Sequence, residues 1–179
     1  MATRARIGIQ HKDGTITAAY QHWDGYPGGL GYNLVENWTD QDKVYLAISL
    51  GNSSKWGQII GEKINFDDRD NPLHEVQNVY YTRDRGEKDQ GPKTYKDWGD
   101  YLKNGFNSGE EYIYLMMDTG EKDWSGKSIG TWCYASQDYV EGKGFLDATG
   151  FKPLEEDAIN EHIVSLQRYL KERAERKAA

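Results

Sequence analysis

The chain has 179 residues, with 22 Lys and Arg against 29 Asp and Glu, a net charge of −7, and one cysteine. This length suits one domain, the lone Cys133 excludes a disulfide framework, and no apolar run is long enough for a membrane span. The acidic balance argues against a general nucleic-acid binder, which needs a basic footprint. Because the N-terminus lacks the apolar core of a signal peptide, the expected setting is a reducing cytoplasm.

The chain opens with a hairpin pattern. Two segments of alternating character flank Asp13-Gly14, a pair that favours a two-residue type I′ turn. Such a turn sets Ile9 opposite Ala18 and gives one mostly apolar face. A register shifted by one residue would set Ile9 opposite Thr17 and mix the two faces, so the two-residue turn is predicted.

Several short elements are expected after a glycine-rich corner at residues 25–31. Helices are predicted where apolar residues recur at helical spacing behind a capping residue, and strands where β-branched and aromatic residues run together. The predicted helices begin near Gly31, at Thr39 and at Thr94; the predicted strands are 5–9, 16–20, 58–60, 78–82, 112–116 and 131–134; a charged loop is expected at 83–92 and a polar connection at 118–130.

The last segment gives the clearest helical pattern. Ile159, Ile163, Leu166 and Leu170 repeat at helical spacing with charged residues between them, and residues 171–179 are expected to be a frayed or solvated helix end. Antiparallel strands with interspersed helices predict a single α+β domain over the whole chain. Its antiparallel sheet opens with the N-terminal hairpin, and several short helices and a long C-terminal helix complete it.

Several motifs approach known sites without matching them. Ser125-Gly126-Lys127-Ser128 lacks the first glycine of a phosphate-binding loop, because Glu121 stands there. The acidic residues 67–71 lack the Gly and Glu that complete a calcium loop, and the four histidines show no zinc-site spacing. No metal and no cofactor is therefore expected, and Cys133 is predicted to be a buried small hydrophobic residue.

Residues 20–27 concentrate unusual chemistry where a strand gives way to a turn. On an extended chain His22 and Asp24 point to the same side, and a carboxylate beside an imidazole can fix its tautomer and raise its basicity, as general-base work requires. They are the candidate catalytic residues. The alternative is structural: His22 lies on the inward face of the hairpin and hydrogen-bonds within the corner to stabilise it.

The same corner has features of a ligand site. Aromatic side chains stack on bases, while arginines, glycine-rich backbone and the free N–H groups of a helix starting near Gly31 receive phosphates. Whether these groups converge in space is not decided by the sequence. The candidate ligand-binding residues are Arg6, Tyr20, Trp23, Gly25, Tyr26, Gly29, Gly31, Tyr81 and Arg83.

The corner also carries a resemblance. His22-Trp23-Asp24-Gly25-Tyr26-Pro27, followed by Gly29-Leu30-Gly31 and preceded by the strand Arg6-Ile7-Gly8-Ile9, resembles a family of small, mostly uncharacterised bacteriophage proteins. The resemblance extends over about residues 1–40. It implies a phage accessory protein made in the cytoplasm of the infected bacterium, and it brings no known reaction.

Two classes of function follow. The first is a phage accessory protein, for host takeover or anti-defence, that binds a small anionic ligand such as a nucleotide signal. If it also cleaves this ligand, the activity would be that of a hydrolase or phosphodiesterase, with His22 as general base or acid and Asp24 orienting it; binding alone is slightly favoured. The second class is an acidic inhibitor that binds a bacterial host enzyme or defence complex. The histidine–aspartate corner favours the first class, and a structural virion component ranks below both.

Overall fold

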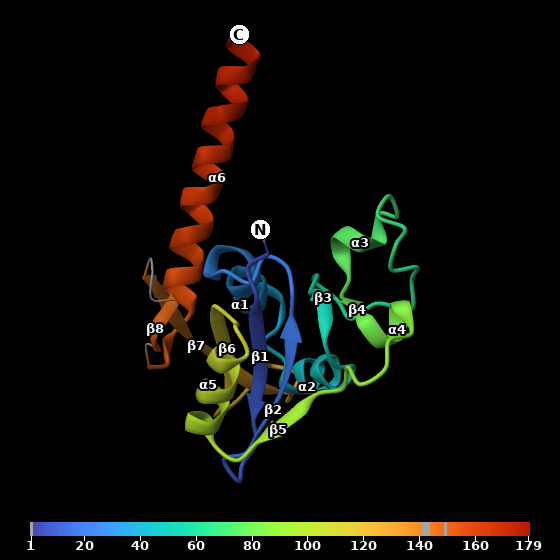
Figure 1. The fold of residues 1–179 in the computed structure, drawn as a ribbon, viewed down its shortest axis with the longest axis vertical. Helices are drawn as coiled ribbons and strands as arrows, with labels where there is room; N and C mark the ends of the chain where they lie inside the picture. The colour runs from blue at the N-terminus through green and yellow to red at the C-terminus, as the bar shows by residue number, and fades with distance from the viewer. Residues whose placement is uncertain (1, 141–143, 149) are drawn as a thin grey trace.

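The computed structural model describes residues 2–140, 144–148 and 150–179, which form the predicted α+β fold (Figure 1). The strands are β1 (Ala5–Gln10), β2 (Ile16–Gln21), β3 (Ser53–Lys55), β4 (Val79–Tyr80), β5 (Lys93–Tyr95), β6 (Tyr112–Lys122), β7 (Ser128–Val140), β8 (Gly144–Ala148) and β9 (Lys152–Pro153). The helices are the π-helical turn η1 (Pro27–Gly31), α1 (Tyr32–Asn37), α2 (Gln41–Ser49), α3 (Leu73–Val76), α4 (Tyr81–Arg85), α5 (Trp98–Asn107) and α6 (Glu155–Ala178).

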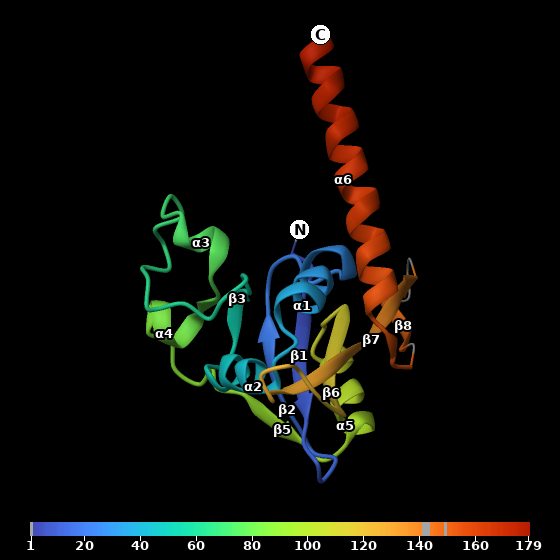
Figure 2. The ribbon, with the colours of Figure 1, turned by 180° about the vertical axis from the view of Figure 1, so that it is seen from behind.

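The strands form a mixed, mostly antiparallel sheet in the order β4-β3-β2-β1-β6-β7-β8, with β5 paired to β2 and β9 paired to β7. The N-terminal hairpin supplies two central strands, because β1 is antiparallel to β2 and parallel to β6. Helices cover both faces of these strands (Figures 1 and 2). On one face η1, α1, α2 and the start of α6 bury Ile7 with Leu34 and Trp38, and on the other face α5 buries Ile16 with Phe106.

The hairpin register differs from the predicted one by one residue. Ile9 pairs with Thr17 rather than with Ala18, so the register is the shifted one. The His11 N–H donates to the Thr15 carbonyl at 2.8 Å, so the loop has three residues, and Gly14 takes φ +88° as three-residue loops require. The predicted register is wrong because it assumed that only one face is buried. Both faces are covered, so apolar residues on either side find a core.

Between residues 39 and 60 the predicted elements exist with different bounds. Asp40, rather than Thr39, caps α2, and its carboxylate accepts the N–H groups of the next turn. Gly51 follows the helix with φ +89°, as expected of a residue that ends a helix. The strand predicted at residues 58–60 lies instead at β3, and Ile59 forms only an isolated bridge.

The second half of the chain also departs from the predicted bounds. The strand predicted at residues 78–82 ends after two residues and turns into α4, which occupies part of the expected loop. β6 and β7 extend far into the polar connection predicted at residues 118–130. Asp97, rather than the predicted Thr94, caps α5, which therefore begins at Trp98.

α6 is the predicted C-terminal helix, and it leaves the body of the fold after its first turns (Figures 1 and 2). Ala158 is buried, whereas the side chains of residues 163–178 are exposed. Residues 171–178 are helical and solvated. In the described part of the chain, no helix is long and apolar enough to cross a membrane.

Candidate functional site

The corner between β2 and η1 is fixed by backbone contacts. Asp24 has φ +56°, a left-handed conformation that aspartate tolerates, and its carbonyl accepts the Leu30 N–H at 2.9 Å. The Gly25 carbonyl accepts the Tyr114 hydroxyl of β6 at 2.6 Å. A Cβ on Gly25 would lie 2.7 Å from the Thr3 carbonyl oxygen, so this position needs glycine. The corner is therefore held rigidly against the sheet.

A cavity of about 320 Å³ lies at this corner. It combines aromatic rings, side-chain amides and three charged residues. These residues come from the end of β2, the corner with η1, α1, the end of β3 with the loop after it, and α3. Four candidates from the sequence, Trp23, Asp24, Tyr26 and Gly29, line it together. The full lining is Gln21, Trp23, Asp24, Tyr26, Gly29, Leu30, Tyr32, Asn33, Asn37, Lys55, Trp56, Gly57, Gln58 and Glu75.

Two of the amides hold the cavity wall in place. The Gln21 amide donates to the Trp23 carbonyl at 2.5 Å and accepts the Trp56 N–H at 3.1 Å. The Asn33 amide donates to the Gly57 carbonyl at 2.9 Å. These bonds join β2 and α1 to the segment after β3, so the wall is built before any ligand arrives.

The three charged residues of the cavity are free to meet a ligand. Lys55, Asp24 and Glu75 form no ion pair with any other described residue. The Gln58 side chain likewise makes no hydrogen bond within the described ranges. The cavity thus offers one cation, two carboxylates and an amide that can both donate and accept.

His22 and Asp24, the candidate catalytic residues, are not joined by a hydrogen bond. The His22 Nδ1 lies 2.6 Å from the Tyr20 hydroxyl, and its ring meets the edge of Trp23 at 4.7 Å between centroids. Strand alternation directs Tyr20 and His22 away from the face of Gln21, so His22 does not line the cavity. Burial, together with the nearby Arg4 guanidinium, lowers the pKa of His22. The imidazole is therefore neutral at pH 7.

Arg6 and Tyr20 lie on the α5 side of the sheet, away from the cavity. They face each other across β1 and β2. Arg6 is buried and its Nε donates to Glu110 at 3.0 Å, while its Nη1 contacts the Tyr95 hydroxyl. Burial raises the pKa of Tyr20 to about 12, so its phenol stays protonated.

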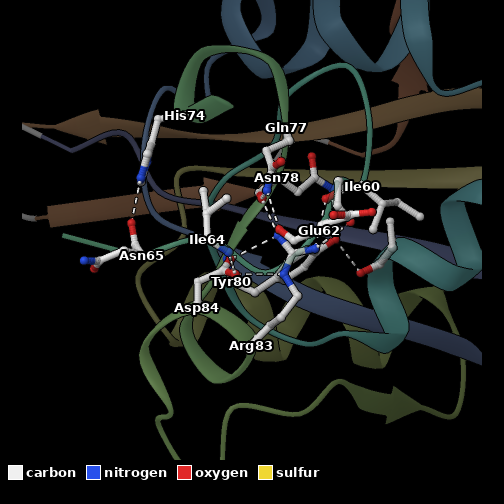
Figure 3. Close-up of polar contacts among 12 residues, drawn as sticks. Ile60, Glu62, Ile64, Asn65, His74, Gln77, Asn78, Tyr80, Arg83 and Asp84 are labelled. Atoms are coloured by element: carbon white, nitrogen blue, oxygen red, sulfur yellow. Dashed lines mark hydrogen bonds and ion pairs between the residues drawn. The ribbon is translucent and has the colours of Figure 1, made fainter. Parts of the chain in front are cut away.

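Arg83 organises the loop between β3 and α4 (Figure 3). Its guanidinium donates to the carbonyls of Ile60, Gly61 and Asn78 at 2.8–3.1 Å and to both carboxylate oxygens of Asp84. These five contacts account for all five of its N–H groups, so none remains for a phosphate. Tyr81, the adjacent candidate, packs its ring against another aromatic ring of this loop.

The expected anion site at a helix N-terminus is not formed. The N–H groups of Gly29 and Gly31 donate to the Tyr26 carbonyl, and that of Leu30 to the Asp24 carbonyl. Gly31 packs beneath the corner, where a Cβ would lie 3.0 Å from the side chain of Leu154, the residue before α6. The π-helical turn therefore uses the donors that the sequence assigned to a phosphate.

Lys55 and Trp56 are the site residues that the sequence did not indicate. Lys55 is the last residue of β3 and Trp56 follows it, and neither belongs to a motif. The sequence predicts only a strand at residues 58–60 in this segment, and nothing in its spacing connects Lys55 or Trp56 to the corner. Only the parallel pairing of β3 with β2 brings the two segments together.

No protein-family model, curated protein or solved structure matches the chain. Within residues 2–140, 144–148 and 150–179, no group of three or more His, Cys, Asp or Glu side chains could hold a metal ion.

Proposed function

We propose that the corner cavity binds a small ligand that combines a planar ring with an anionic group, as a nucleotide does. The observation that carries the proposal is that Trp23 and Tyr26 line the same cavity as Lys55, which has no ion pair with a described residue. Aromatic rings stack on bases, and an ammonium group binds phosphate as a point charge. The Gln58 amide is available to the edge of a base.

The charges of the cavity restrict the ligand. Asp24 and Glu75 give it a net negative charge in spite of Lys55. Like charges brought together in an interface oppose binding, so a ligand with three or four negative charges is disfavoured. The expected ligand is a nucleoside monophosphate or a cyclic nucleotide rather than a triphosphate.

The proposal is for binding without cleavage. His22 does not line the cavity, and its Nδ1 is engaged by Tyr20. A general base must come within hydrogen-bond reach of the proton that it removes. The resemblance of the first residues to bacteriophage proteins supports a setting in an infected bacterium, where a binding protein of this kind would sequester a nucleotide signal.

Calorimetric titration of the purified protein with nucleosides, monophosphates, cyclic nucleotides and triphosphates tests the proposal. We expect saturable binding of monophosphates or cyclic nucleotides that is stronger than that of triphosphates. Trp23→Ala and Lys55→Ala should each weaken binding about tenfold or more, because they remove a stacking surface and the only cation of the cavity.

Two matched variants serve as controls. Trp124 is 98% exposed at the tip of the β6–β7 hairpin, and Lys103 is exposed on α5. Trp124→Ala and Lys103→Ala should bind as the wild type does. Absence of saturable binding, or unchanged binding by both cavity variants, would remove the proposal.

A further inference from the structure

The outer part of α6 carries apolar side chains that no described residue covers. Ile163, Leu166 and Leu170 are 45%, 49% and 53% exposed. The helix projects away from the sheet at this point (Figures 1 and 2). Helical segments of this length are marginal in water on their own, and most of their stability comes from packing an apolar face.

These residues lie on one line along the helix. Ile159, Ile163, Leu166 and Leu170, the α6 stripe, are spaced by four, three and four residues, which is the alternation of a coiled-coil seam. The side of α6 that faces the body is different: the His162 ring stacks on Tyr32 at 3.7 Å between centroids. At about 100° per residue, the centre of the stripe is turned roughly 70° away from this contact, so His162 lies at one edge of the stripe. Ile159 is partly buried beside this contact, whereas the stripe from Ile163 outward is exposed and open to a partner.

Charged residues flank the α6 stripe asymmetrically. Glu155 and Glu156 stand at its N-terminal end, and Arg173 and Lys177 at its C-terminal end. None of these four forms an ion pair with a residue that the structure describes. A parallel pair of such helices would place acid against acid and base against base, whereas an antiparallel pair places acid against base.

We propose that two copies of the chain pair through the α6 stripe as antiparallel helices related by a two-fold axis. Ile159 of one copy faces Leu170 of the second, and Ile163 faces Leu166, so all four apolar residues are covered. This register sets Glu156 against Arg173. Such a stripe is self-complementary, which is the requirement for a two-fold interface. The pairing does not depend on a ligand in the corner cavity.

Sedimentation equilibrium of the full chain gives the first test. We expect a reversible dimer, with Leu166→Lys raising its dissociation constant at least tenfold because it buries an unpaired charge in the seam. Val164 is 53% exposed on the opposite side of the helix, so Val164→Lys is the matched control and should leave the dimer unchanged. A monomer at all accessible concentrations, or equal effects of the two variants, would overturn the proposal.

Cysteine cross-linking tests the direction of pairing. Ile159→Cys and Leu170→Cys are prepared separately; the native Cys133 is buried, and the wild-type chain gives the background. A mixture of the two variants should form a disulfide-linked dimer, whereas each alone should not, since like positions lie about 16 Å apart along antiparallel helices. Cross-linking of each variant with itself would show a parallel pair and contradict the proposal.

Discussion

Two buried arginine–carboxylate pairs of this protein differ in how completely their partners are satisfied. Arg83 and Asp84 are adjacent in the chain, and both Asp84 oxygens are used: Oδ1 accepts the Ile64 N–H at 3.1 Å and Oδ2 accepts the Tyr80 N–H at 2.7 Å, besides the guanidinium. Arg6 and Glu110 are 104 residues apart, and Arg6 contacts only Oε1. The buried Glu110 Oε2 has no hydrogen-bond partner in the described part of the chain.

The difference separates an ion pair that stabilises the fold from one that lowers its stability. A buried charge is tolerated when its remaining lone pairs are hydrogen-bonded, and it is costly when they are not. Burial accordingly raises the pKa of Glu110, although the Arg6 guanidinium opposes this shift. We therefore expect the Arg83–Asp84 pair to be essential for the fold and the charge of Glu110 to be dispensable.

The largest expected effect comes from Asp84→Ala. This change leaves Arg83 without its carboxylate and strands the N–H groups of Ile64 and Tyr80, so it should lower the free energy of unfolding by about 3–5 kcal/mol. Urea denaturation measures the loss. Asp67→Ala, an exposed carboxylate of the same loop, is the control and should change stability by less than about 0.5 kcal/mol. A loss below about 1 kcal/mol for Asp84→Ala would erase the contrast between the pairs.

Tyr95→Phe should have an intermediate effect. It removes the hydroxyl that Arg6 contacts, keeps the buried ring, and leaves a buried N–H unsatisfied, which costs about 1–3 kcal/mol. The control is Tyr45→Phe, because the Tyr45 ring is half exposed and its hydroxyl makes no hydrogen bond with a described residue. The difference between the melting temperatures of the two variants in thermal unfolding measures the Arg6–Tyr95 contact. Equal melting temperatures would mean that Arg6 does not need the phenol.

Glu110→Gln should have the smallest effect, and its sign depends on pH. Because the pKa of Glu110 is raised in the folded state, the native protein favours the protonated form. Its contribution to stability is full below the ordinary pKa of 4.5 and is lost as the pH rises through the raised value. Since glutamine resembles the protonated acid, the wild type should lose stability relative to the variant as the pH rises over this range.

Urea denaturation at a series of pH values, with Glu111→Gln as the neighbouring control, measures this difference. The control should show no comparable trend. If Glu110→Gln instead loses stability relative to the wild type as the pH rises, the Arg6–Glu110 pair stabilises the fold and both pairs behave alike.

The parts of the fold that depend on local pattern could be predicted from the sequence. The period of Ile159, Ile163, Leu166 and Leu170 gives α6 directly, and the pattern at Thr94 to Leu102 indicates α5, although that helix begins only at Trp98. The hairpin register could not be predicted in the same way, because it depends on whether distant segments cover the second face of the sheet. That information lies in α5, whose Phe106 packs with Ile16 on the second face although the two residues are far apart in the sequence.

The candidate site was predicted only in part, for the same reason. Trp23, Asp24 and Tyr26 are neighbours in sequence and share the cavity, whereas Lys55 reaches it only through the pairing of β2 with β3. Arg83 was assigned to a ligand because an arginine in a loop gives no sign of its partners. Its carbonyl acceptors are set by the path of the backbone, which no side-chain pattern records.

The ring of Tyr32 lies between the corner cavity and α6. It lines the corner cavity and also stacks on His162, which lies beside the stripe on α6, so one ring contacts both the cavity and the helix that carries the stripe. A ligand in the cavity that favours one placement of this ring changes the dimerisation constant of the chain. Because thermodynamic linkage is reciprocal, dimerisation changes the affinity for that ligand by the same factor. A ring that sits equally well in both states would leave the two equilibria independent.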